Sequence, residues 1–201
     1  MTKPDHAPSS SHDSAARELS RRDAALGLLG VAALAGASRS GAAEKPANVI
    51  VPPGLEYVFE LIARLGPALD MGTSEGITHR QIPVLDGIAS GPKFRGKVLP
   101  GGNDTQRIHE NGRTEILARY LLQADDGGIV QVTNPGVRRA PPDVMKRLGA
   151  GELVDPSLYY FRTTPSFVTT AKAHAWLEES VFVCVGVRRP DSVSLRYFAV
   201  L

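Results

Sequence analysis

The chain has 201 residues, of which 42% are hydrophobic and 22% are charged. Positions 1–43 hold five of the 23 basic and four of the 21 acidic residues, so the remaining 158 residues carry 18 basic and 17 acidic side chains. A domain of that size can bury one hydrophobic core. The near-neutral balance gives no electrostatic reason to expect a nucleic acid as partner.

The N-terminal region has the layout of an export signal. Ser20-Arg21-Arg22-Asp23 directly precedes an Ala/Gly/Leu-rich run over residues 24–37. Two arginines before a short, weakly apolar segment are typical of a twin-arginine signal, which the export machinery reads as an address. The run has 14 residues, fewer than the roughly 20 that a spanning helix needs. We therefore expect the twin-arginine export machinery as a partner and no stable membrane anchor.

The predicted signal divides the chain into three parts. We expect cleavage after Ala37 or near Ala43, which gives a leader over residues 1–43, a lead-in over 44–54 and one domain over 55–201. The expected location is periplasmic or secreted.

Apolar residues at period two predict strands along most of the domain. Every odd position of residues 55–65 is apolar, and residues 113–124 alternate in the same way after the hairpin signal Asn111-Gly112. Further strands are predicted over residues 77–83, 93–99, 129–133, 159–164, 166–170, 180–188 and 192–200. Eight to ten short strands with turn signals between them indicate an all-β fold, an antiparallel sandwich or barrel.

One short helix interrupts the predicted strands. Pro141-Pro142-Asp143 opens a helix predicted over residues 143–148, and Gly149 ends it. Residues 173–179 leave two alternatives open, an extended segment or a single helical turn.

Several residue types that often carry chemistry have a plainer interpretation in this sequence. Gly72-Thr73-Ser74-Glu75-Gly76 matches the spacing of a hydrolase nucleophile elbow, but a strand rather than a helix is predicted after it, so we interpret it as a glycine-rich turn. Cys184 is the only cysteine and lies in an apolar run, which favours a buried thiol over a reactive one. The pairs Arg138-Arg139 and Arg188-Arg189 lie close to prolines, and we interpret them as solvated loop charges.

No metal or organic cofactor is expected. His79, His109 and His174 have no second ligand at helical or turn spacing and no cysteine partner. The sequence also lacks a dinucleotide fingerprint and a phosphate-binding loop.

Short blocks in a fixed order carry a family resemblance from about residue 55 to residue 200. The blocks are Gly91-Pro92-Lys93-Phe94-Arg95-Gly96, Pro100-Gly101-Gly102-Asn103-Asp104, Ala118-Arg119-Tyr120, Tyr160-Phe161-Arg162-Thr163-Thr164-Pro165 and Trp176-Leu177. Together they resemble the family of unknown function DUF3237, also called UPF0311. The resemblance implies a closed antiparallel β-barrel with a small interior cavity, and it implies no settled activity.

The same blocks supply the candidate site residues. Asp104 and Tyr160 are the candidate catalytic pair, because a carboxylate can act as a general base and a tyrosine can donate a proton. Four further side chains are candidates for ligand binding: Arg119, Arg162, His174 and Trp176.

Three positions depart from the pattern of the family. Leu117 and Val168 stand where the resemblance leads us to expect an acid, and Glu178 stands where it leads us to expect an asparagine. If those polar groups act together in relatives, two alternatives follow: a more apolar ligand, or the absence of the relatives' chemistry.

Three functions follow as hypotheses. The first is binding of a small, mostly apolar or aromatic molecule in the barrel lumen. The second is a cofactor-independent isomerase, cyclase or lyase in the same pocket. The third is a structural or protein-interaction barrel whose lumen is filled by side chains.

Overall fold

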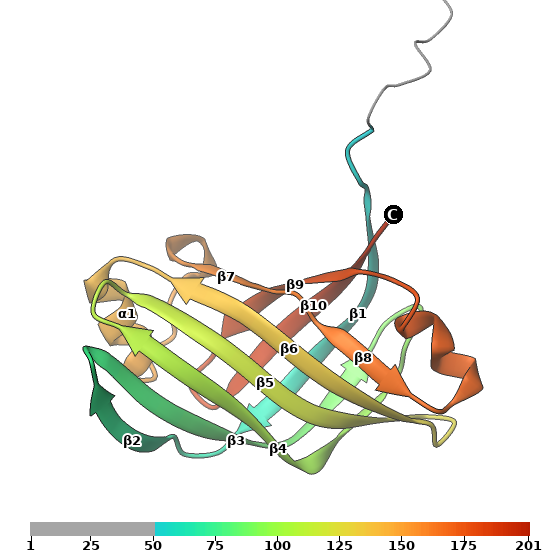
Figure 1. Ribbon diagram of the computed structural model, residues 1–201, viewed down its shortest axis with the longest axis horizontal. Coiled ribbons are helices and arrows are strands. Elements are labelled where there is room, and N and C mark those ends of the chain that lie inside the picture. Colours follow the sequence, from blue (N-terminus) through green and yellow to red (C-terminus); the bar gives the residue numbers. More distant parts are fainter. Residues whose placement is uncertain (1–50) are drawn as a thin grey trace, which may run out of the picture. The chain divides into compact units, whose positions relative to one another are not determined.

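The computed structural model describes residues 51–201 (Figure 1). The predicted export signal lies outside these residues. The described chain forms ten strands, one α-helix and two short 3-10 helices. In chain order they are β1 (Leu55–Leu65), β2 (Leu69–Ser74), β3 (Ile77–Ser90), β4 (Gly96–His109), β5 (Arg113–Ala124), β6 (Ile129–Arg139), α1 (Pro142–Gly149), η1 (Pro156–Leu158), β7 (Tyr160–Thr163), β8 (Ser166–Thr169), η2 (Lys172–Leu177), β9 (Phe182–Arg188) and β10 (Ser192–Val200).

The strands form one antiparallel sheet that closes on itself. The order runs β1-β10-β9-β7-β6-β5-β4-β3, and β1 pairs with β3 to complete the ring. β8 also pairs with β6, so β7 and β8 together occupy one position of an eight-stranded barrel. β2 pairs with β3 alone, outside the ring. The predicted all-β fold, a closed antiparallel barrel with one short helix, is confirmed.

The two ends of the barrel differ in what lies beside them. α1 lies at one end, near the β4–β5 and β6–β7 connections, and η2 lies at the other end, between β8 and β9 (Figure 1). We refer to these as the α1 end and the η2 end.

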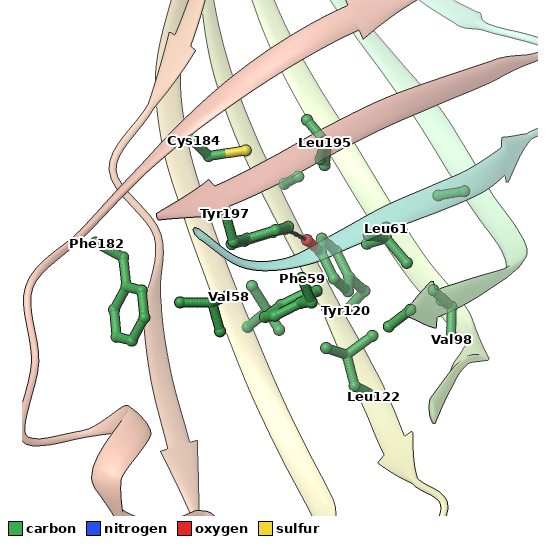
Figure 2. Close-up of a cluster of buried hydrophobic side chains, with 14 of the residues drawn as sticks. Val58, Phe59, Leu61, Val98, Tyr120, Leu122, Phe182, Cys184, Leu195 and Tyr197 are labelled. Atoms are coloured by element: carbon green, nitrogen blue, oxygen red, sulfur yellow. Dashed lines mark hydrogen bonds between the residues drawn. The ribbon is translucent and has the colours of Figure 1, made fainter. Parts of the chain in front are cut away.

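Alternating side chains fill the interior. On β1, Phe59, Leu61 and Ala63 point inward and are buried, whereas Ile62 between them is exposed. Phe59 stacks on Tyr197 of β10 with ring centroids 4.2 Å apart, and the hydroxyl of Tyr197 hydrogen-bonds that of Tyr120 (Figure 2). This aromatic centre joins strands that lie far apart in the sequence, which is what a closed barrel requires of its core.

Strands β1, β5 and β10 have the predicted limits, while β3, β4 and β6 continue well beyond them. The turn at Asn111-Gly112 is confirmed, with Gly112 at φ 82°. β6 passes through Asn134-Pro135-Gly136, where the sequence predicted an end, because Pro135 faces outward and its neighbours complete the ladder with β5. The alternating residues predict that these segments are strands, but pairing with distant strands determines how long each strand is.

Two local interpretations are also settled. Ser74 ends β2, and a two-residue turn at Glu75-Gly76 leads straight into β3, so the Gly-x-Ser-x-Gly stretch is a hairpin turn as predicted. β2 itself was not predicted from the sequence. Segment 173–179 contains most of the 3-10 helix η2, so the helical one of the two alternatives is found.

Over residues 51–201, none of the helices is both long enough and apolar enough to span a bilayer.

Candidate functional site

Polar side chains gather inside the barrel toward the α1 end, where one would expect a hydrophobic core. They surround a small cavity whose remaining walls are apolar side chains such as Leu65, Phe161 and Leu195. The cavity holds about 30 Å³ of water-accessible space, enough for one or two water molecules. The polar residues that line it are Asp104, Gln106, Asn134, Arg138, Thr163 and Arg188. We call these six residues, with the adjoining Arg80, the polar cluster, and the space the lumen cavity.

Strand alternation places the polar cluster. Asp104 and Gln106 follow Val98 and Gly102 on the inward face of β4, and Arg138 follows Val132 on that of β6. β4 bulges between Leu99 and Asn103 by two residues relative to β5, so the inward alternation survives the bulge.

The Pro100-Gly101-Gly102 block makes this bulge possible. Gly101 has φ 103°, a conformation that favours glycine. Gly102 lies so close to β5 that an added Cβ would be 2.6 Å from the Cβ of Tyr120. The two glycines therefore let β4 run against β5 directly before Asp104.

Asp104 is the only carboxylate of the polar cluster. Its Oδ2 accepts a hydrogen bond from Gln106 Nε2 at 2.5 Å, and Gln106 Oε1 accepts one from Arg80 Nη2 at 2.7 Å. Its Oδ1 is buried and has no hydrogen-bond partner among the residues that the structure describes. Burial raises the pKa of Asp104 to about 6, although the Gln106 hydrogen bond and the nearby Arg138 lower it. A carboxyl with this pKa exchanges protons near neutral pH.

Three arginines surround that carboxylate. Arg138 is 4% exposed, and its guanidinium lies 5.8 Å from the centre of the Phe161 ring. Burial, together with the like charge of Arg80, lowers the pKa of Arg138 to about 10. Arg188 donates from Nη1 to the Ser192 carbonyl at 2.8 Å and from Nη2 to the Pro190 carbonyl at 3.1 Å. The polar cluster is thus positively charged in total.

Several buried polar atoms of the cavity wall have no partner within residues 51–201. They include Asn134 Oδ1 and Thr163 Oγ1, in addition to Asp104 Oδ1. Buried polar atoms are nearly always hydrogen-bonded, and leaving one unpaired costs about 1–3 kcal/mol. Water molecules, one or two of which fit the cavity, can supply these partners, and so can the polar groups of a ligand.

The structure separates the predicted catalytic pair. Asp104 lies inside the barrel, whereas Tyr160 is 43% exposed on the outer face of β7. Phe161 and Thr163 take the inward positions of that short strand. The expected pairing of Tyr160 with Asp104 in the lumen is therefore not found, because the alternation on β7 has the opposite phase.

The predicted ligand-binding arginines also face outward. Arg162 shares the outer face with Tyr160, and the guanidinium groups of Arg139 and Arg162 each lie 5.3 Å from the centre of the Tyr160 ring. Arg119 is exposed on β5, as its inward neighbour Tyr120 requires. Any binding role of these side chains would concern the outer surface and stays a prediction.

His174 and Trp176 lie at the η2 end, away from Asp104. His174 Nε2 is 3.1 Å from Asp126 Oδ1, and its ring packs edge-on against Phe94 with centroids 5.3 Å apart. The Trp176 ring lies 6.0 Å from that of Phe182. They belong to the packing that covers this end, and neither lines the lumen cavity.

The three departures from the family pattern lie outside the lumen cavity. Leu117 is on the outward face of β5 and Val168 is 60% exposed on β8. The exposed Glu178 accepts a hydrogen bond from the Thr169 amide at 2.5 Å. These residues therefore do not make the lumen more apolar.

Sequence reasoning missed the arginines of the polar cluster. The interpretation of Arg138 and Arg188 as solvated loop charges is wrong, because Arg138 is buried in β6 and Arg188 is half-buried at the end of β9. The period-two alternation of β6 and β9 could have identified both arginines as inward-facing. Arg138 has the same parity as Val130 and Val132, and Arg188 that of Phe182 and Cys184.

Cys184 is buried at the centre of the barrel, as predicted. Burial raises the pKa of its thiol to about 12, which keeps the thiol protonated. Across residues 51–201, no three His, Cys, Asp or Glu side chains gather in a way that could hold a metal ion.

The fold and the cavity define a class of protein: a closed antiparallel barrel with a positively charged, partly unsatisfied polar cluster in its lumen. The family described as "Protein of unknown function (DUF3237)" matches residues 53–200, and the chain belongs to this family.

The matches to relatives in this family extend over nearly the full length of those relatives. A UPF0311 protein of Rhodopseudomonas palustris is 40% identical over 151 residues, which are 74% of this chain and 99% of that protein. A UPF0311 protein of Clostridium acetobutylicum is 37% identical over 146 residues, 72% of this chain and 92% of its own. The crystal structure of the R. palustris protein RPA1785, of unknown function, superposes with a TM-score of 0.71 at 37% identity, covering 76% of this chain and 99% of that one.

A more distant relative has a named activity. The hydroalkoxylation enzyme phnH of Penicillium herquei is 33% identical over 82 residues, 41% of this chain and 54% of that protein. The crystal structure of an enzyme from the same organism has the same fold, with a TM-score of 0.59 at 22% identity over 77% of this chain and 98% of that chain.

Proposed function

We propose that the barrel is a cofactor-independent enzyme that adds a hydroxyl group across an activated carbon–carbon double bond, or catalyses the reverse elimination, beside Asp104 at the α1 end of the barrel. The observation that carries this proposal is the Asp104 carboxyl, whose Oδ1 is buried without a hydrogen-bond partner among residues 51–201 and whose pKa is raised to about 6. Apolar side chains and three arginines surround this carboxyl, an environment typical of a general acid–base residue.

The reaction needs a proton to be moved between two atoms of the substrate. Ionised Asp104 takes the proton of the attacking hydroxyl while its oxygen bonds to the far carbon of the double bond of an enone. The π electrons move to the carbonyl oxygen, and Arg138 stabilises the resulting enolate. Asp104 then returns the proton to the carbon beside the carbonyl. The net change is an isomerisation, so no oxidant or second reactant is required.

The named activity of the distant relative supports this proposal. Hydroalkoxylation is the addition of an O–H group across a carbon–carbon double bond, and phnH of P. herquei bears that name. The enzyme was the second of the three functions that the sequence suggested. Binding of a small molecule in the lumen, the first of them, is a necessary part of it.

The test uses ortho-crotonoylphenol, which cyclises to a methylchromanone by such an addition. The uncatalysed reaction gives a racemic product, so a chiral site is recognised by an enantiomeric excess in chiral chromatography. We expect an excess with the purified wild-type domain and its loss in Asp104→Asn, with a rate at least about 100-fold lower, since removing one essential proton-transfer group typically costs 10²–10⁴. Tyr160→Phe is the matched control and should keep the excess.

Two outcomes would count against the enzyme. A racemic product with the wild type would show that this class of enone is not turned over, and native mass spectrometry of the purified protein would then test for simple binding of a retained molecule. An excess that survives in Asp104→Asn would show that another group moves the proton.

We further propose that the chain is exported by the twin-arginine route. The support is the position of Arg21 and Arg22 directly before the only early apolar run. Replacing both by lysine should retain the protein in the cytoplasm, whereas Arg17→Lys, outside the pair, should leave export unchanged. Cell fractionation decides this, and unaffected export of the double variant would exclude the route.

A further inference from the structure

The polar cluster contains more positive charge than its own acid can balance. Arg80, Arg138 and Arg188 share one carboxylate within the cluster, Asp104, while Asp70 also lies within electrostatic reach of Arg80, and Asp191 within reach of Arg188. Each of the three affects the pKa of Asp104, so all lie within electrostatic reach of it. Arg138 is the buried one of the three, and Asp104 is the one carboxylate near it within residues 51–201. A buried cation that is not fully compensated is costly, so an anion is the ligand that suits the surroundings of Arg138.

Two of the three arginines have a guanidinium nitrogen without a hydrogen-bond partner within residues 51–201. Arg188 is held by two backbone carbonyls, and Arg80 donates from Nη2 to Gln106. The Nε atoms of Arg80 and Arg138 are buried, and neither has a hydrogen-bond partner in the part of the chain that the structure describes. These two donors belong to guanidinium groups from β3 and β6, which are separated in the sheet by β4 and β5 but lie within electrostatic reach of each other inside the barrel.

A second hollow reaches the same two arginines from outside. It lies beneath α1, is lined by Arg80, Arg138, His109, Met145 and Lys146 among others, and holds about 280 Å³. We call it the α1 pocket. Arg138 lines both the α1 pocket and the lumen cavity. A molecule seated in the α1 pocket therefore meets Arg80 and Arg138, and Arg138 separates it from Asp104 on the lumen side.

We propose that the ligand of this site carries a carboxylate, which Arg138 and Arg80 bind in the α1 pocket while the reacting end of the molecule lies beside Asp104. A carboxylate is planar and accepts two parallel hydrogen bonds from a guanidinium group. One carboxylate also leaves one net positive charge in the cluster, which remains to stabilise an enolate oxygen. The identity of the reacting end rests on the proposed function, whereas the carboxylate site does not.

The test compares two probes that differ only in charge: ortho-crotonoylphenol with a carboxylate on the ring, and the same compound with a primary amide in its place. Binding is measured by titration calorimetry with Asp104→Asn, which should bind without turnover, and by thermal shift with the wild type. We expect the carboxylate to bind at least about tenfold more tightly than the amide.

Variants of adjacent residues assign that preference to its site. In the Asp104→Asn background, Arg138→Gln should bind both probes equally, and Arg80→Gln should reduce the preference. Arg139→Gln is the matched control, because Arg139 is the next residue on the same strand and faces outward. It should keep the full preference.

The outcomes separate this inference from the proposed function. Equal binding of the two probes by the wild type, or a preference that survives in Arg138→Gln, overturns the carboxylate site. A preference that is present in the wild type while Asp104→Asn still cyclises the probe supports the site and overturns the proposed role of Asp104. Should Arg138→Gln fail to fold, the wild-type comparison and Arg80→Gln still decide. Tighter binding of a phosphate analogue than of the carboxylate would also overturn the assignment.

Discussion

The two halves of the barrel interior are completed in different ways. Toward the η2 end, the inward side chains are aromatic and aliphatic, and they fill the space themselves; Phe167, for example, packs edge-on against Phe182 at 4.9 Å. Toward the α1 end, the same strands present Asp104, Arg138 and other polar groups, and some of their atoms have no hydrogen-bond partner within the described part of the chain. The same strands form both halves of the barrel, so the halves differ only in the side chains that point inward.

Single strands show the change from one half to the other. β6 begins inward with Val130 and Val132 and ends with Arg138, and β9 begins with Phe182 and ends with Arg188. The comparison shows that the packed apolar core and the polar cluster are separated along the barrel axis. The apolar half supplies the free energy that holds the polar half in an unsatisfied state.

The largest expected effect is a loss of stability from the apolar half. Phe167→Ala removes a side chain that is 5% exposed and should lower the free energy of unfolding by about 4 kcal/mol, because it leaves a cavity between Phe182 and Tyr197. Val168→Ala, on the outer face of the same strand, should change it by less than about 0.5 kcal/mol. Urea denaturation measures both. Equal effects would show that the η2 half is not a packed core.

The next effect is a pH dependence that belongs to the polar half. Folding raises the pKa of Asp104 from 3.8 to about 6, so the protonated carboxyl is favoured in the fold. Its contribution to stability is present below about pH 4 and is lost as the pH rises through about 6. The difference in unfolding free energy between wild type and Asp104→Asn should therefore fall by about 2 kcal/mol from about pH 4 to about pH 7.

Because both proteins share every other titrating group, the difference isolates Asp104. A difference that stays constant with pH would mean that the carboxyl is solvated and ionises normally.

A smaller effect tests the boundary between the halves, where the hydroxyls of Tyr120 and Tyr197 bond each other. The Tyr120 hydroxyl also contacts the Asn134 side chain. Tyr120→Phe should cost about 2 kcal/mol, since it leaves the Tyr197 hydroxyl buried without this partner, and Tyr197→Phe about 1 kcal/mol. The double variant should cost less than the sum, as measured in a double-mutant cycle. Additive costs would show that the two hydroxyls do not interact.

The smallest effect has the opposite sign. Arg138→Met replaces a buried cation by an apolar side chain and should raise the unfolding free energy of the ligand-free protein by about 1 kcal/mol. Arg139→Met should change it by less than about 0.5 kcal/mol. Thermal and urea denaturation without ligand test this. Strong destabilisation by Arg138→Met would indicate that the arginine is there for the fold and not for a ligand.

Local sequence patterns determined the fold class and much of the element order. Period-two alternation gave β1, β5 and β10 their limits, because one face of each strand is buried and the other is wet. Asp104 was found from its block, and its inward position agrees with a role in the lumen. The same patterns missed β2 and ended β6 early, since both segments hold glycine and depend on a partner strand for their extended form.

Tertiary structure alone decided which face of a short strand is inside and which distant residues meet. Four residues of β7 cannot set their own phase, so only pairing with β6 and β9 shows that Tyr160 points outward and Phe161 inward. The polar cluster joins side chains from β3, β4, β6, β7 and β9, whose meeting depends on closure of the ring. The sequence shows that Arg80, Asp104 and Arg138 are charged, but only the closed barrel brings them together and buries them partly or fully.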